Sequence, residues 1–266
     1  MKNVDMKKLL VFILIIALLI LAAFGVSKLV GKGSKPSKEV QEEVTNLATK
    51  YYATMTEGYT TEFNGIDALY SREKTTYDDI NKAAIIYTAI RYAEDNDIDL
   101  SISREAEINL EDLYGREDVV AYNAEQIRKI VKKLFNKDLV NKDYEGGITF
   151  AYNYYYDQDT DTYTVEGNPL AVLDEGDSLA VKTKVVDTVK KGDDIIVSLI
   201  VAYVYPGEEG SYVYYSESDG ADKNRVAETT KKEFVDEKDD SFNKYEITLK
   251  KASDGYAFES IEKVKK

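Results

Sequence analysis

The chain has 266 residues, a formal net charge of −14, and neither histidine nor cysteine. The lack of both residue types excludes Ser-His-Asp and Cys-His nucleophiles, thiol catalysis, disulfides, iron–sulfur clusters and most zinc sites. Carboxylate, Lys, Tyr and Ser/Lys chemistry remains, and no cofactor is implied.

An uninterrupted apolar run occupies residues 9–26. As a helix rising about 1.5 Å per residue, it would span roughly 27 Å, close to the thickness of the hydrocarbon core of a bilayer. We therefore predict a transmembrane signal anchor at residues 9–26, preceded by a cytoplasmic tail at residues 1–8 and followed by a Gly/Ser/Lys stalk at residues 27–37. The lipid bilayer is the partner that this segment implies.

A cleaved secretory signal is the alternative interpretation of the same segment. Three lysines precede the run, and Ala23-Phe24-Gly25 resembles a small-x-small cleavage site. The run is longer than the ~7–15 apolar residues usual in a signal peptide, which favours an uncleaved anchor.

Lysines flank the run on both sides, so the positive-inside rule leaves its orientation open. The short tail is typical of a signal n-region, and a lack of cysteine is common in exported proteins of organisms without oxidative folding machinery. Both points favour a single-pass protein of the cell membrane whose C-terminal domain lies outside.

The charge is divided sharply along the chain. Residues 1–35 contain six Lys and one Asp, a net +5, which leaves −19 for residues 36–266. A domain with this excess repels nucleic acid and anionic lipid, so we expect no nucleic-acid partner.

Residues 38–142 are predicted to form a helical region. The first helix begins at Ser37, after which apolar residues recur at helical spacing. The second covers residues 79–94, with Thr76 and Asp79 as a capping pair.

A third helix is predicted over residues 124–135. Asn123 supplies its N-cap, and the apolar residues of this segment share one face. Residues 97–122, which precede it, are expected to form loops and short irregular pieces.

Residues 143–266 are predicted to form an antiparallel β region, because the apolar period changes to two. Alternating runs at residues 179–185 and 195–203 flank a Lys-Lys-Gly-Asp turn and indicate a hairpin. An Asp-Gly turn between residues 245–249 and 256–258 indicates a closing hairpin.

Helices followed by strands indicate an α+β fold: an N-terminal transmembrane helix, then a helical layer packed on a C-terminal antiparallel meander sheet. This order is similar to cone-shaped folds of the nuclear-transport-factor-2-like (NTF2-like) kind, a likeness that covers residues 38–266 and rests on the order of elements alone.

Three stretches of sequence resemble a group of bacterial proteins. They are MKNVDMKKLL at residues 1–10, GGITFAYNYYYDQDTDTYTV at residues 146–165 and KYEITLKKASDGYAFESIEKV at residues 244–264. With them the chain resembles uncharacterised single-anchor envelope proteins of low-GC Gram-positive bacteria. The resemblance implies no activity.

Asp157, Asp159 and Asp161 form a D-x-D-x-D run, the spacing that opens an EF-hand calcium loop. The sixth position is Thr162 where that loop requires Gly, and the twelfth is Asn168 where it has a bidentate Glu. A solvated polar hairpin turn is the competing interpretation of a weak, extracellular type of calcium site.

Tyrosine is unusually frequent, with 22 Tyr and no Trp. Cross-strand aromatic packing explains such clusters without a function. A recognition face is the functional alternative, because Tyr supplies a large contact area at low entropic cost. The candidate binding residues are Tyr154, Tyr155, Tyr156, Tyr163, Tyr212 and Tyr214.

These observations favour a membrane-tethered, extracytoplasmic, non-catalytic domain that binds a protein or another component of the cell envelope, such as a glycan. The alternative is a carboxylate-dependent hydrolase of cell-wall glycan, which would need two carboxyl groups facing each other across a cleft. No catalytic residue is identified.

Overall fold

The structure is a computed structural model, and it describes residues 33–52, 73–114, 119–147, 152–167, 180–217, 220–230 and 240–264. The tail at residues 1–8 and the predicted anchor at residues 9–26 lie outside this part of the chain. No helix among the described residues has the length and apolar character needed to cross a membrane. The folded part is α+β with antiparallel sheets, as predicted.

The larger sheet has seven antiparallel strands, six of which follow the order β1-β10-β9-β6-β7-β8. The seventh, β5, pairs with β6 along the edge opposite β9. The strands are β1 (Lys74–Thr76), β5 (Ala180–Lys191), β6 (Asp194–Pro206), β7 (Tyr212–Tyr215), β8 (Arg225–Thr229), β9 (Asn243–Ala252) and β10 (Gly255–Lys263). Both predicted hairpins, β5–β6 and β9–β10, are confirmed.

The alternation of buried and half-buried side chains at the start of β6 sets the register of this sheet. Val197 and Leu199 are fully buried and lie opposite the buried Ile247 and Tyr245 of β9. A shift of one residue would turn this apolar row to solvent, so the pairing is strongly specified. Gly192 adopts a φ of +65° in the β5–β6 turn, a conformation that glycine reaches at little cost.

The smaller sheet has three antiparallel strands in the order β2-β4-β3, which are β2 (Ala121–Asn123), β3 (Tyr152–Asp157) and β4 (Thr162–Gly167). The single meander sheet expected from the sequence is therefore replaced by two sheets. The reason is that β4 pairs with β2, a strand from the predicted helical region, and not with β5.

The described helices are α2 (Lys38–Leu47), α4 (Lys82–Asp95), α5 (Arg104–Tyr114) and α6 (Ala124–Phe135). Short helical turns are η1 (Ala48–Tyr52), η3 (Tyr77–Asp79), η5 (Glu208–Gly210) and η6 (Asp222–Asn224). The capping predictions hold: Ser37 caps α2, and the Asn123 side chain accepts from the amide of Gln126 at the start of α6. Thr76 and Asp79 form their capping box on η3, and α4 begins separately after Asn81.

The prediction that residues 97–122 form loops and irregular pieces is wrong, because this segment contains α5 and β2. Ser103 Oγ accepts a hydrogen bond from the amide of Ala106 at the start of α5. Ala106 and Leu110, four residues apart, are buried together on one face of this helix.

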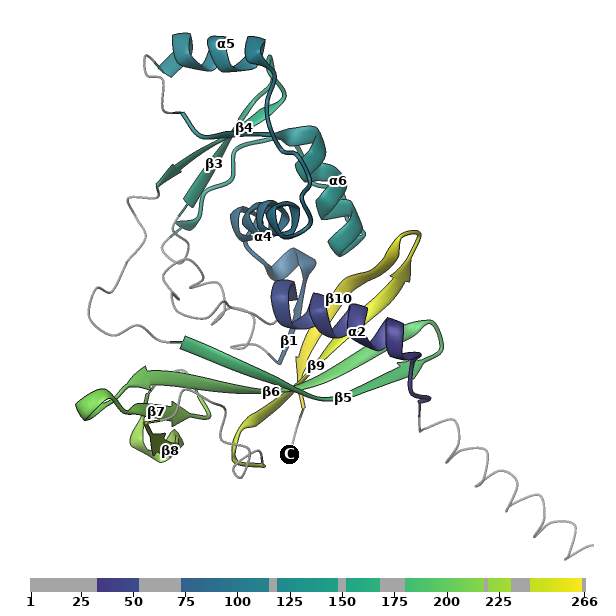
Figure 1. Cartoon of the computed structure of the whole chain (residues 1–266), viewed down its shortest axis with the longest axis vertical. Helices are drawn as coiled ribbons and strands as arrows, with labels where there is room; N and C mark the ends of the chain where they lie inside the picture. Colours follow the sequence, from purple (N-terminus) through teal and green to yellow (C-terminus); the bar gives the residue numbers. More distant parts are fainter. Residues whose placement is uncertain are drawn as a thin grey trace, which may run out of the picture.

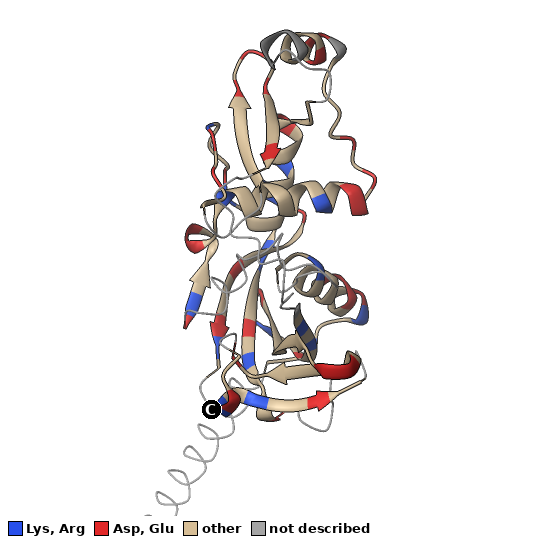
Figure 2. Ribbon diagram, turned by 90° about the vertical axis from the view of Figure 1, so that its left-hand side faces the viewer, with Lys and Arg blue, Asp and Glu red and all other residues tan. Residues whose placement is uncertain are grey.

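One hydrophobic core joins the two sheets, and α6 lies between them (Figure 1). This helix packs on β10 of the larger sheet and on β2 and β4 of the smaller one, while α4 packs on α6 and β3. β1 and β2 belong to residues 38–142 but pair with strands of residues 143–266. The two predicted regions are thus interleaved in space. Acidic positions are spread over both the upper and the lower half of the molecule (Figure 2).

Candidate functional site

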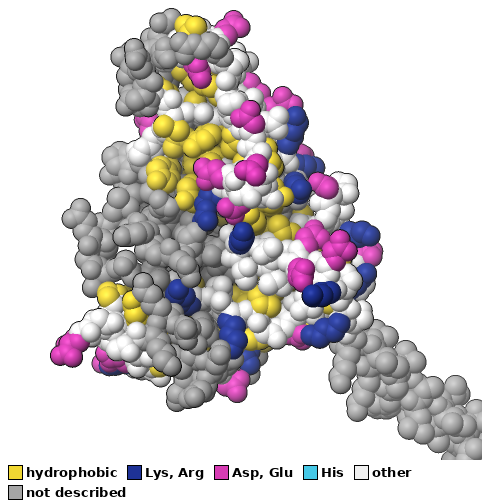
Figure 3. All heavy atoms as spheres, in the orientation of Figure 1, with side chains coloured by type: hydrophobic (Ala, Val, Ile, Leu, Met, Phe, Trp, Pro, Cys, Tyr) yellow, Lys and Arg dark blue, Asp and Glu magenta, His cyan; other side chains and the backbone are white. Residues whose placement is uncertain are grey.

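A pocket of about 370 Å³ lies between α4 and the smaller sheet. It is lined by Tyr87, Ile90, Arg91, Glu94, Val120, Tyr122, Tyr152, Tyr154, Val165 and Gly167, and we call it the Tyr pocket. Figure 3 shows hydrophobic side chains gathered on this face of the molecule over α4, β3 and β4. A concave apolar site with a few polar groups is the usual form of a ligand site.

Four tyrosines from three segments form the aromatic walls of the Tyr pocket. Tyr152 and Tyr154 are two residues apart on β3 and therefore project from the same face of the strand. Tyr87 of α4 stacks on Tyr152, with ring centroids 5.9 Å apart and ring planes inclined by 18°. Tyr154 is 1% exposed, so it packs deeper than the half-buried Tyr152 and Tyr122.

Arg91 and Glu94 of α4 supply the charged groups of the Tyr pocket. They lie about one helical turn apart, yet neither side chain forms an ion pair or a hydrogen bond with another described residue. Burial raises the pKa of Tyr122, and the negative charge of Glu94 raises it further. The carboxylate of Glu94 is therefore close enough to act on the pocket wall.

The charged groups of the Tyr pocket differ from those that a glycan hydrolase needs. Glu94 is the one carboxyl group among the described residues that line the Tyr pocket, whereas a glycan hydrolase needs two facing carboxyls. The described carboxyl groups with displaced pKa values are Asp99, Asp161 and Asp187. Hydrogen bonds from Ser101, Arg128 and Lys35, respectively, hold each pKa below its usual range. A general acid would need the opposite shift.

The structure does not bring the six candidate tyrosines together on one face. Tyr154, Tyr163 and Tyr214 are at most 1% exposed and belong to hydrophobic cores, so packing explains their place in the sequence. Tyr155, Tyr156 and Tyr212 are half-buried. Tyr212 and Tyr214 lie on β7 of the larger sheet, away from the β3–β4 hairpin. Among the six, Tyr154 lines the Tyr pocket.

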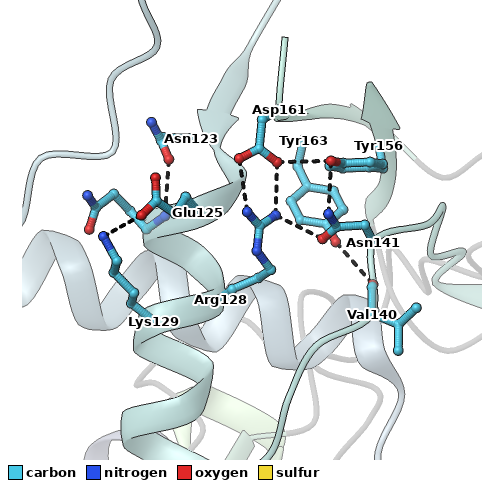
Figure 4. A network of polar contacts seen from close by, with 10 residues as sticks. Asn123, Glu125, Arg128, Lys129, Val140, Asn141, Tyr156, Asp161 and Tyr163 are labelled. Atoms are coloured by element: carbon cyan, nitrogen blue, oxygen red, sulfur yellow. Dashed lines mark hydrogen bonds and ion pairs between the residues drawn. The ribbon is translucent and has the colours of Figure 1, made fainter. Parts of the chain in front are cut away.

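Asp161, proposed from the sequence as a calcium ligand, is held by a guanidinium group (Figure 4). Arg128 of α6 donates two hydrogen bonds of 2.9 Å to its two carboxylate oxygens. The Tyr156 hydroxyl donates a third to Asp161, also at 2.9 Å, and Asn141 bridges Arg128 and Tyr156. Hydrogen bonding to Arg128 lowers the pKa of Asp161. The network ties the β3–β4 turn to α6.

The other two carboxylates of the D-x-D-x-D run lie in the same turn. Asp157 accepts hydrogen bonds of 2.8 Å from both the amide and the hydroxyl of Thr160, and Asp159 is exposed. The described part of the chain contains no group of three or more Asp or Glu residues placed to hold a metal ion. This arrangement favours the hairpin-turn interpretation of the run.

A second pocket of about 270 Å³ lies between α2, α6 and the β9–β10 turn. Its Lys133 ammonium lies 3.3 Å from a carboxylate oxygen of Asp254 and 5.5 Å from the ring centroid of Tyr92. The positive group of this pocket is therefore already engaged within the protein.

Sequence reasoning did not identify Tyr87, Arg91, Glu94, Tyr122 and Tyr152 as site residues. Tyr87 lies three residues before Ile90 in the helix predicted over residues 79–94, a spacing that indicates a core position. Tyr122 lies in the segment predicted to be irregular. The clustering of tyrosine around residues 152–156 was the one signal that pointed to this place.

We found no match of this chain to a protein-family model, to a curated protein or to a solved structure.

Proposed function

We propose that the chain is a membrane-tethered, extracytoplasmic, non-catalytic domain that binds a component of the cell envelope in the Tyr pocket. The observation that carries the proposal is this pocket, in which aromatic walls meet one guanidinium and one carboxylate group. Such a combination fixes the orientation of a ligand through a few polar contacts while the rings supply the contact area.

Support for the tether comes from the apolar residues 9–26 and from the resemblance to single-anchor envelope proteins. The stalk leads directly into the folded domain. Ser34 and Lys190 exchange two backbone hydrogen bonds of 3.0 and 2.7 Å, so the chain is attached to β5 eight residues after the apolar run ends. The folded domain would therefore be held close to the bilayer.

We further propose that the fold is a cone-shaped arrangement of the NTF2-like kind. It is supported by the order of elements and by the enclosure of the Tyr pocket between a helix and a sheet.

Crosslinking in intact cells tests the proposed function. The full chain would carry a photoreactive residue at Val120, which lines the Tyr pocket and is 53% exposed. We expect a crosslinked envelope component that disappears in Tyr152→Ala and persists in Tyr212→Ala, a variant of a half-buried tyrosine outside the pocket. Equal crosslinking in both variants would contradict the proposal.

Protease treatment of the same cells tests the sidedness. An outward domain is digested in intact cells, whereas a cytoplasmic one is digested only after lysis. The full chain should also sediment with membranes, and recovery of the uncleaved chain in the soluble fraction would contradict the tether.

A further inference from the structure

The Tyr pocket combines flat aromatic surface with one pure donor and one pure acceptor. Arg91 presents up to five N–H donors and no acceptor, and an ionised Glu94 only accepts. A ligand that satisfies both must therefore carry acceptors and donors side by side. Neighbouring hydroxyl groups meet this need, because each hydroxyl both donates and accepts.

The aromatic walls suit a ring with an apolar face. Tyr87 and Tyr152 stack on each other, with ring planes inclined by 18°, and together form one aromatic wall. The face of an aromatic ring carries partial negative charge and attracts the partially positive hydrogens of C–H groups. A pyranose ring has such C–H groups on its faces and hydroxyl groups at its edge.

The size of the Tyr pocket also limits the ligand. Its volume of about 370 Å³ lies near the lower end of the range for small-molecule sites, roughly 300–1,000 Å³. A protein partner would instead need roughly 800 Å² of its own surface buried against a broader face. One or two sugar rings are the better match.

Charge narrows the choice among envelope glycans. The chain carries a net charge of −14, and Arg91 is balanced by Glu94 within the pocket. A polyanionic wall polymer would be repelled by this field, whereas a neutral saccharide is not.

We infer that the Tyr pocket binds a neutral saccharide unit of an envelope glycan, packed against the aromatic wall that Tyr87 and Tyr152 form, with its hydroxyl groups bridging Arg91 and Glu94. This inference rests on the proposed function and names its ligand class.

The test is calorimetric titration of the detergent-solubilised full chain with chitotetraose, a neutral oligomer of N-acetylglucosamine. Hyaluronan tetrasaccharide, which alternates this sugar with a uronate, is the charged comparison. We expect chitotetraose to bind at least about tenfold more tightly than the charged probe. We expect Tyr152→Ala and Arg91→Gln each to weaken chitotetraose binding about tenfold, a change of about 1.4 kcal/mol.

Glu94→Gln keeps the inference testable if Tyr152→Ala fails to fold, because Glu94 is exposed and its replacement leaves the core intact. It should weaken chitotetraose binding at least about fivefold, since a carboxylate bond to a hydroxyl is worth more than a neutral one. Tyr212→Ala is the matched control and should bind like the wild type.

Two results would overturn the inference. One is equal binding of chitotetraose by the wild type and all pocket variants. The other is no saccharide binding while the cellular crosslink at Val120 still depends on Tyr152; the pocket would then take another ligand class, and the proposed function would stand. Loss of both the saccharide binding and the crosslink would remove the proposed function as well.

Discussion

Asp161 illustrates how one carboxylate of an apparent calcium motif is used within the protein. Arg128 binds both of its oxygens; the Arg128 side chain is 26% exposed and that of Asp161 is 41% exposed. The sequence could show the spacing of the three Asp residues but not the guanidinium group that α6 places opposite one of them. A metal ion would have to displace Arg128 from this position.

We predict that Asp161→Asn lowers the free energy of unfolding by about 1 kcal/mol at pH 7, a value kept small by the exposure of the pair. Arg128 lowers the folded-state pKa of Asp161, so the stabilisation is complete above the unfolded pKa of about 4. It is lost as the pH falls through the folded pKa. Urea unfolding at pH 7 and at acidic pH should therefore show the wild-type advantage shrinking in acid.

Asp159→Asn is the control for this experiment, because Asp159 is exposed in the same turn. It should match the wild type at both pH values. An Asp161→Asn protein as stable as the wild type at pH 7 would show that the ion pair contributes nothing to stability.

Thr188 of β5 is 1% exposed, and its hydroxyl has no hydrogen-bond partner among the residues that the structure describes. A buried hydroxyl without a partner costs about 1–3 kcal/mol. We predict that Thr188→Val, which replaces the hydroxyl with a methyl group of similar size, raises the free energy of unfolding by about 1 kcal/mol in urea. Thr162→Val is the matched control: Thr162 is equally buried, but its hydroxyl lies 2.8 Å from that of Thr160, so this variant should lose stability. A destabilised Thr188→Val would contradict the prediction.

The helices and hairpins with strong local signals could be predicted from the sequence. The third predicted helix, over residues 124–135, coincides with α6 because its N-cap, Asn123, and its single apolar stripe are both visible in the local sequence. The β5–β6 and β9–β10 hairpins followed from alternation around a glycine turn. In each case the information is local.

The elements that were not predicted depend on distant partners. β1 and β2 are only three residues long, too short to show a period, and they exist because β10 and β4 offer them an edge. The division into two sheets has the same origin, since no local pattern indicates that β4 pairs with β2. The Tyr pocket combines α4, β2 and β3, and therefore could not be assembled from the sequence.

The attachment of the stalk to β5 depends on the lack of a side chain at Gly33. A Cβ atom there would lie 2.2 Å from Cγ1 of Val189 and 2.4 Å from the carbonyl oxygen of Lys190. That oxygen accepts a hydrogen bond from the Ser34 amide, so a side chain at Gly33 would separate Ser34 from Lys190 and break their backbone hydrogen bonds. The stalk is thus held at the start of the domain by backbone contact.

We predict that Gly33→Ala exposes the Lys190 amide, which donates to the Ser34 carbonyl oxygen. Its protection from hydrogen exchange should fall about fivefold to tenfold, as expected for the loss of a bond worth ~1 kcal/mol. Gly167→Ala, where a Cβ atom meets open space, should leave this amide unchanged. Unaltered protection in Gly33→Ala would mean that the bridge tolerates the side chain.

The core that joins the two sheets is rich in tyrosine, and this composition makes the fold sensitive to alkali. Burial raises the pKa of Tyr77 to about 12. Burial likewise raises the pKa values of Tyr52, Tyr163 and Tyr245 well above the usual range. In the unfolded chain these phenols would lose their protons near pH 10. In the folded chain the same phenols keep their protons. The folded state is therefore favoured over the unfolded state as long as these phenols stay neutral.

The stabilisation from these tyrosines is complete below pH 10 and is lost as the pH rises through the folded-state values. We therefore predict cooperative unfolding above about pH 10, in which far-ultraviolet circular dichroism disappears together with a rise in tyrosinate absorbance. The absorbance reports tyrosine alone, since the chain has 22 Tyr and no Trp. Tyr163→Phe, which loses a hydrogen bond of 3.4 Å to the carbonyl oxygen of Val140, should unfold at a higher pH than the wild type. Full tyrosinate absorbance in a chain that keeps its circular dichroism would show that the core accepts the charges, and that its tyrosines do not set the alkaline limit.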